Sequence, residues 1–80
     1  MIINMLERSV VLKKSAIAKT THQNQINQGL MTPPVLVGAR RVAWPSYEID
    51  EILKARIAGK SNEEIKSLVT ELVAQRGDFA

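Results

Sequence analysis

The sequence predicts one small, mainly α-helical domain with a single β-hairpin. The stretch LMTPPVLVGARRVAWP, residues 30–45, contains two short apolar runs joined by Gly-Ala-Arg, which is typical of two strands and a turn. A polar helical pattern that ends in a glycine comes before it, and two amphipathic segments with helix-start signals follow it. The length of 80 residues suits one compact core.

Two short helices are expected before the hairpin. Residues 7–14 place an apolar run among charges, which fits one or two helical turns, although the pair Val10 and Val11 also fits a strand. After a turn at 15–17, residues 18–28 form a helix that Gly29 ends. One face of this helix carries Ala18, His22 and Ile26, spaced four residues apart.

The hairpin strands are expected at 35–37 and 41–44, after two prolines that favour an extended approach. A two-stranded hairpin is barely stable alone, so it must pack on the helices. Four side chains are expected to make that contact: Val35, Val37, Val42 and Trp44.

Two helices are expected after the hairpin. Ser46 suits the N-cap of the first, and Gly59 ends it. Its apolar stripe is Ile49, Ile52, Leu53 and Ile57. Ser61 and Glu64 form a capping box at the start of the second, which Gly77 ends. Its stripe is Ile65, Leu68, Val69, Leu72 and Val73, which either packs back on the same chain or forms the contact of a homodimer or of a cooperative oligomer on DNA.

The order of the elements is helix, turn, polar helix, hairpin, helix, helix. This order predicts a winged helix-turn-helix followed by C-terminal helices. We place the winged helix-turn-helix domain at residues 1–58 and the C-terminal helical extension at residues 59–80.

Charge is distributed unevenly along the chain. Residues 1–45 hold six Lys or Arg and one acid, Glu7, whereas residues 46–80 hold five Lys or Arg and seven Asp or Glu. A basic half beside a mildly acidic half is compatible with a surface for a polyanion, and equally with a small protein that is basic for no special reason.

The sequence also indicates the compartment. The chain has no cysteine, which excludes disulfides and thiolate metal sites and fits a reducing cytoplasm. No apolar run approaches the about 18 residues that a membrane span needs. The first residues lack the pattern of a signal peptide. We therefore expect a cytoplasmic protein without a membrane partner.

The polar helix and the hairpin turn suggest a surface for double-stranded DNA. The outward face of the helix carries amides and hydroxyls, which both donate and accept hydrogen bonds, as the reading of base edges requires. The two arginines of the turn suit phosphate; neighbouring strand residues point to opposite faces, and we favour Arg40 over Arg41. The candidate DNA-binding residues are Lys13, Lys14, Lys19, Thr20, Thr21, Gln23, Asn24, Asn27, Arg40 and Arg41.

Nothing in the sequence favours catalysis. It contains no paired histidines, no glycine-rich phosphate loop and no serine beside a base, so we expect no enzyme activity, no cofactor and no metal. Trp44 is expected in the core rather than under a ligand, because the chain has few other aromatic residues to fill volume. His22 is expected to be a half-buried packing residue rather than a metal ligand.

The stretch GLMTPPVLVGARRVAWPSYEIDEI, residues 29–52, resembles the AlpA family of small phage-type regulators. The matching features are Gly29, Pro34, the Gly38-Ala39-Arg40 turn, Trp44 and the acidic helix that follows. The resemblance extends over about residues 10–76 and is weaker before the hairpin. There, Ser15-Ala16 stands where the family has a Thr-Gly turn, Lys19 stands in place of an arginine, and Gln23 replaces a frequent tyrosine.

The resemblance implies a winged helix-turn-helix related to those of excisionases and MerR-like proteins. It also implies regulation of transcription of prophage or mobile-element genes, or an excisionase-like role in setting the direction of recombination. Two other classes stay open on the residues alone: an antitoxin or anti-repressor that binds a protein, and a protein that binds structured RNA.

Overall fold

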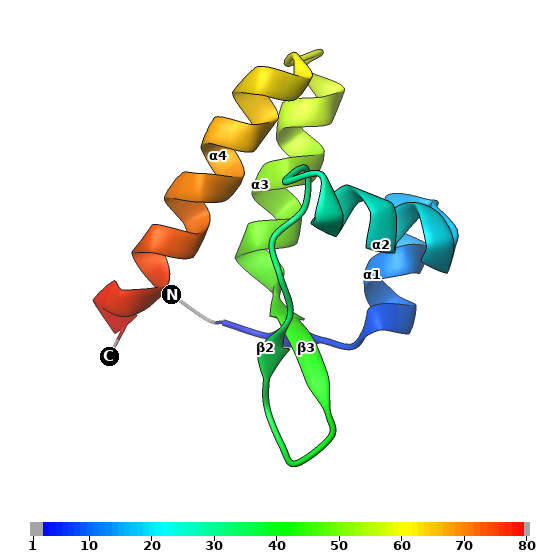
Figure 1. Cartoon of the computed structure of the whole chain (residues 1–80), viewed down its shortest axis with the longest axis vertical. Coiled ribbons are helices and arrows are strands. Elements are labelled where there is room, and N and C mark those ends of the chain that lie inside the picture. Colours follow the sequence, from blue (N-terminus) through cyan, green and yellow to red (C-terminus); the bar gives the residue numbers. More distant parts are fainter. Residues whose placement is uncertain (1–2, 80) are drawn as a thin grey trace.

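The computed structural model describes residues 3–79, with side chains described as far as residue 77, so the expected domain limits at residues 1 and 80 lie outside it. The described residues form four α-helices and a three-stranded antiparallel sheet. Helices α3 (Ser46–Ile57) and α4 (Asn62–Gln75) run antiparallel, and α1 (Arg8–Ser15) and α2 (Lys19–Asn27) lie to one side of them (Figure 1). The hairpin projects from the end of the molecule that lies opposite the turn between α3 and α4. The expectation of a mainly α-helical chain with a small β-hairpin is confirmed.

The two N-terminal helices are joined by a very short turn. Ala16 has φ 56° and ψ 41°, the left-handed conformation, and its N–H lies 3.4 Å from the Lys13 carbonyl oxygen. Residues 16–18 therefore turn the chain directly from α1 into α2. Gly29, with φ +78°, lies just beyond the end of α2, as expected.

The sheet contains one strand that the sequence did not predict. Strands β2 (Val35–Leu36) and β3 (Val42–Pro45) form the expected hairpin, and the Val37 N–H donates to the Arg41 carbonyl at 2.9 Å. Strand β1 (Met5–Leu6) pairs with the other side of β3, which gives the order β1-β3-β2. β3 is therefore the central strand.

The hairpin packs on the helices through fewer residues than expected. Trp44 is fully buried, its indole N–H donates to the Thr32 carbonyl at 2.8 Å, and Val35 is half-buried. Val37 and Val42 are 49% and 37% exposed, so their expected packing is wrong. They lie towards the tip, where the two strands extend past the helices (Figure 1).

Helix α3 differs from the expectation at both ends: Ser46 is not its N-cap, and Ile57 does not pack on the core. Ser46 is its first residue rather than its N-cap, because β3 continues directly into the helix. The Ser46 hydroxyl instead accepts the Asn4 N–H at 3.3 Å, and the Ser46 N–H donates to the Asn4 carbonyl at 2.7 Å. Ile57 is 87% exposed and not part of the buried stripe, because it ends the helix where the chain turns away at Gly59.

α4 begins with the expected capping box. The Glu64 N–H donates to the Ser61 hydroxyl at 3.2 Å, and the Glu64 carboxylate accepts the Ser61 N–H at 3.3 Å. The helix ends at Gln75, and a short 3-10 helix, η1 (Arg76–Phe79), runs through Gly77, so the expected end at Gly77 is replaced by a tighter turn. Most of the α4 stripe is buried within this one chain, in the core formed by Val11, Leu30, Met31, Trp44, Ile49, Ile52, Ile65, Val69 and Leu72.

Candidate nucleic-acid interface

Helix α2 has two clearly different faces. His22 is fully buried and Ile26 half-buried, so the expected inward face is formed by these two residues. Ala18 does not join them, because it precedes the first helical residue and is exposed. The six polar candidates on this helix are all exposed: Lys19, Thr20, Thr21, Gln23, Asn24 and Asn27.

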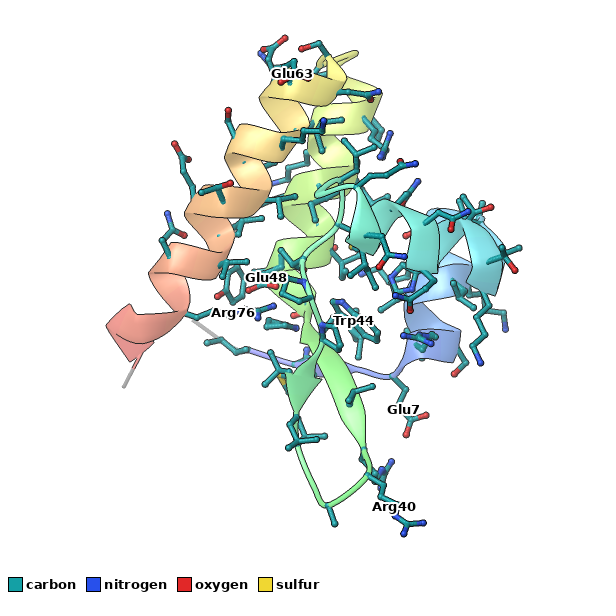
Figure 2. All side chains as sticks on the ribbon, viewed as in Figure 1. Glu7, Arg40, Trp44, Glu48, Glu63 and Arg76 are labelled. Carbon is teal, nitrogen blue, oxygen red and sulfur yellow. The ribbon has the colours of Figure 1, made fainter. Side chains whose placement is uncertain are left out.

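The two arginines of the hairpin have different surroundings. The Arg40 side chain points from the tip away from the body of the molecule (Figure 2), and none of the described carboxylates pairs with it. The Arg41 guanidinium lies 2.6 Å from the Glu7 carboxylate, at the junction between β1 and α1. Arg40 is thus the more available cation, and Glu7 neutralises Arg41.

The two lysines at the end of α1 have different surroundings. Lys14 Nζ lies 3.0 Å from Asp50 Oδ1 and so connects α1 to α3. Lys13 is exposed. The structure therefore exposes all six α2 candidates, places Arg40 and Arg41 together at the hairpin, and pairs Lys14 with α3.

Arg8 is a residue that the sequence reasoning missed. Its guanidinium lies over the Trp44 ring, 5.3 Å from the ring centroid, and Arg8 Nη2 donates to Gln23 Oε1 at 3.4 Å. Gln23 Nε2 in turn donates to Asn27 Oδ1 at 3.3 Å. Arg8 and Gln23 are 15 positions apart on different helices, so no local pattern signals their contact.

His22 lies beneath this surface, edge-on to Trp44 with ring centroids 4.9 Å apart. It is fully buried rather than half-buried as expected. Burial, and then the charge of Arg8, lower the pKa of His22 below its ordinary value of 6.5. The neutral form of the imidazole is therefore favoured, and the ring helps to hold α2 against β3.

The arrangement offers hydrogen-bonding groups on a supported helix and an exposed cation at the end of a hairpin. Within residues 3–79, no group of three or more His, Cys, Asp or Glu side chains is placed to hold a metal ion, and no helix is both long and apolar enough to cross a membrane. Comparison with protein-family models, curated proteins and solved structures returned no match for this chain.

Proposed function

We propose that the protein binds double-stranded DNA as a winged helix-turn-helix regulator, with α2 in the major groove and the β2–β3 hairpin as a wing on the phosphate backbone. The observation that carries the proposal is the division of α2 into two faces. His22 fixes the helix to the core, while Gln23 and Asn24 beside it are exposed. Amide side chains in that position suit the donor and acceptor pattern of base edges.

The connections of α2 support this docking. The three-residue turn after α1 and the exposed N-terminal half of α2 are what a recognition helix requires, since its first turns contact the bases. The hairpin carries its cation at the tip, where a charge meets the DNA backbone before it meets a base.

We also propose that the chain is a member of the AlpA family and regulates transcription of prophage or mobile-element genes in the cytoplasm, without a cofactor or an enzyme activity. Ala16 supports the family assignment. It has a positive φ at the position where the family carries the glycine of its turn. The residue type differs, but the turn has the conformation that favours glycine.

The first test is selection of binding sites from a random pool of duplexes, followed by mobility shifts of the selected and a random duplex between 50 and about 200 mM salt. Affinity for both duplexes should fall as the salt concentration rises. The slope of log K against the logarithm of salt concentration should be ~ −0.9 for each phosphate that the protein neutralises. Recovery of no sequence, or tighter binding to a folded RNA than to any duplex, would contradict the proposal.

The second test is Gln23→Ala. It should lower affinity for the selected duplex by roughly 1–3 kcal/mol and leave binding to the random duplex nearly unchanged. Gln75→Ala, an exposed glutamine at the end of α4, is the matched control and should change neither. An equal loss on both duplexes would assign a structural role to Gln23.

A further inference from the structure

Arg8 is held in place by the core rather than left free on the surface. It is the first residue of α1, and its guanidinium lies over Trp44, 5.3 Å from the ring centroid. Trp44 has no exposed surface and is itself anchored by its hydrogen bond to the Thr32 carbonyl. A cation over an indole face is attracted to the ring, so Arg8 has a preferred position beside α2.

From this position Arg8 constrains the side-chain amide of Gln23. Arg8 Nη2 donates to Gln23 Oε1 at 3.4 Å, and Gln23 Nε2 donates to Asn27 Oδ1 at 3.3 Å. A guanidinium has five N–H donors and no acceptor. A flipped Gln23 would place its NH₂ group against those donors, so only one orientation of the amide is compatible with Arg8.

We propose that Arg8 is a positioning residue that fixes the Gln23 amide so that it recognises adenine. This rests on the proposed docking of α2 in the major groove. Each amide atom keeps a second hydrogen-bonding site for DNA: a lone pair on Oε1 and a second hydrogen on Nε2.

Adenine presents the complementary pair in the major groove, the N6 donor beside the N7 acceptor. Guanine presents two acceptors, O6 and N7, and would repel the fixed oxygen. A fixed amide therefore discriminates between these two bases, whereas an amide that is free to rotate offers two donors to guanine from its NH₂ group alone.

Three variants of the full chain test the proposal. Arg8→Gln replaces the donor-only group by one that donates and accepts, so both orientations of Gln23 become compatible with it. Arg8→Lys keeps a positive, donor-only group. Arg56→Gln, an exposed arginine on α3, is the matched control for the loss of one charge.

The first readout needs no DNA. In ¹⁵N-labelled free protein, the two Gln23 side-chain amide protons should resonate apart from those of solvated glutamines. Arg8→Gln should shift both away from their wild-type positions, because the amide then adopts two orientations, whereas Arg8→Lys and Arg56→Gln should not. Unmoved resonances in Arg8→Gln would overturn the proposed contact. Circular dichroism melts show whether each variant is folded. Should Arg8→Gln unfold, a folded Arg8→Lys variant with shifted Gln23 resonances would overturn the proposal, because a positive donor-only group should fix the amide.

The second readout is base preference, measured by competition mobility shifts at the base pair where Gln23→Ala abolishes discrimination. Wild type should prefer adenine to guanine by roughly 5- to 150-fold, as a good bidentate contact does. Arg8→Gln should lose most of this preference, and Arg8→Lys should keep most of it.

Three results would overturn the positioning role. They are an intact preference in Arg8→Gln, a preferred base other than adenine, and an equal loss on selected and random duplexes, which would make Arg8 a phosphate contact. Failure of the wild type to select any sequence would remove the adenine assignment together with the proposed function. In that case the free-protein resonances would still decide whether Arg8 fixes Gln23.

Discussion

Ala16 is the one non-glycine residue among residues 3–79 that has a positive φ. The left-handed conformation costs an L-residue roughly 1–2 kcal/mol. The turn requires it, because the N–H groups of Ala16 and Ile17 close onto the carbonyls of Lys13 and Leu12 as α1 ends. The junction between α1 and α2 is therefore strained as it stands.

We expect Ala16→Gly to stabilise the protein. Glycine relieves the strain but gives the unfolded chain extra conformational entropy, which costs about 0.4–1 kcal/mol. The expected net gain in the free energy of unfolding is therefore up to about 1.6 kcal/mol, measured by urea unfolding. Ala58→Gly is the control. Ala58, at the end of α3, has φ −74°, so a glycine there relieves no strain and should lower the free energy of unfolding. Destabilisation by Ala16→Gly would show that the turn is not strained.

His22 should make stability depend on pH. Its pKa is lowered in the folded state, so the unfolded chain binds the proton more readily. The free energy of unfolding should be constant above the unfolded pKa of about 6.5 and fall as the pH drops below it, by at most about 1.4 kcal/mol per pH unit. The fall should stop once the pH is below the folded pKa.

His22→Phe keeps an aromatic ring against Trp44 and should remove this dependence between pH 7 and 5. His22 is the only histidine in the sequence, so no other imidazole contributes in that range. Urea unfolding of both proteins at several pH values is the measurement. An equally steep fall in the variant would show that carboxylates, rather than His22, are responsible.

At the scale of single elements, the hairpin places its two arginines in unlike electrostatic settings. Glu7 holds Arg41 at 2.6 Å, although both side chains are largely exposed, at 62% and 73%. An exposed pair of this kind contributes little stability. Its main effect is to neutralise one of the two cations that the turn provides.

Arg40→Ala should therefore weaken binding to selected and random duplexes by a similar factor and make the salt dependence shallower by about one unit of slope. Arg41→Ala should do less, because its charge is already balanced. Salt titrations of both variants on both duplexes are the measurement. A selective loss on the selected duplex would mean that the wing contacts bases. Unchanged slopes would mean that the hairpin does not contact DNA, which would move the search to Lys13 and Lys19.

The elements that the sequence predicted correctly are those with local signals. The helix ends at Gly29 and Gly59 and the capping box at Ser61 depend on neighbouring residues alone. β1 was missed because two residues carry no period, and only pairing with β3 about 40 positions away defines the strand. The exposure of Ile57 was missed because an apolar stripe on one helix does not show how far along that helix the packing elements extend.

The exposed residues of the candidate site could be predicted from the sequence, but their partners could not. The polar face of α2 follows from helical spacing, and the structure exposes all six of its candidates. The partners of those residues did not follow. Arg8 meets Gln23, and Glu7 meets Arg41, only after the chain has folded back on itself.

At the scale of the whole molecule, a partly buried ion pair connects the C-terminal helices to the hairpin. Glu48 has no exposed surface, and the two side chains face each other (Figure 2). Arg76 donates two hydrogen bonds to the Glu48 carboxylate, from Nε to Oε2 at 2.8 Å and from Nη2 to Oε1 at 2.7 Å. Arg76 Nη2 also donates to the Pro33 carbonyl at 2.8 Å, just before β2. The hydrogen bonds to Glu48 raise the pKa of Arg76, so the guanidinium stays charged.

Arg76→Met should therefore destabilise the whole protein by roughly 3–5 kcal/mol, because it leaves the Glu48 charge buried without its partner. The double variant Glu48→Leu/Arg76→Met should recover much of the loss, since it buries no charge. Arg56→Met, on the surface of α3, should change stability by less than about 0.5 kcal/mol. Urea unfolding is the measurement, and a loss for Arg76→Met as small as that for Arg56→Met would contradict the role of the pair.

The placement of Trp44 gives the protein a built-in optical reporter. It is the only tryptophan in the sequence, and it touches α1 through Arg8, α2 through His22 and the chain before β2 through Thr32. Native emission should be blue-shifted, because the indole is shielded from water. Any event that lifts the guanidinium from the ring, protonates the imidazole or separates the hairpin from the helices should change its intensity or wavelength. Unlabelled protein can thus reveal in real time whether the junction of these three parts responds to a ligand.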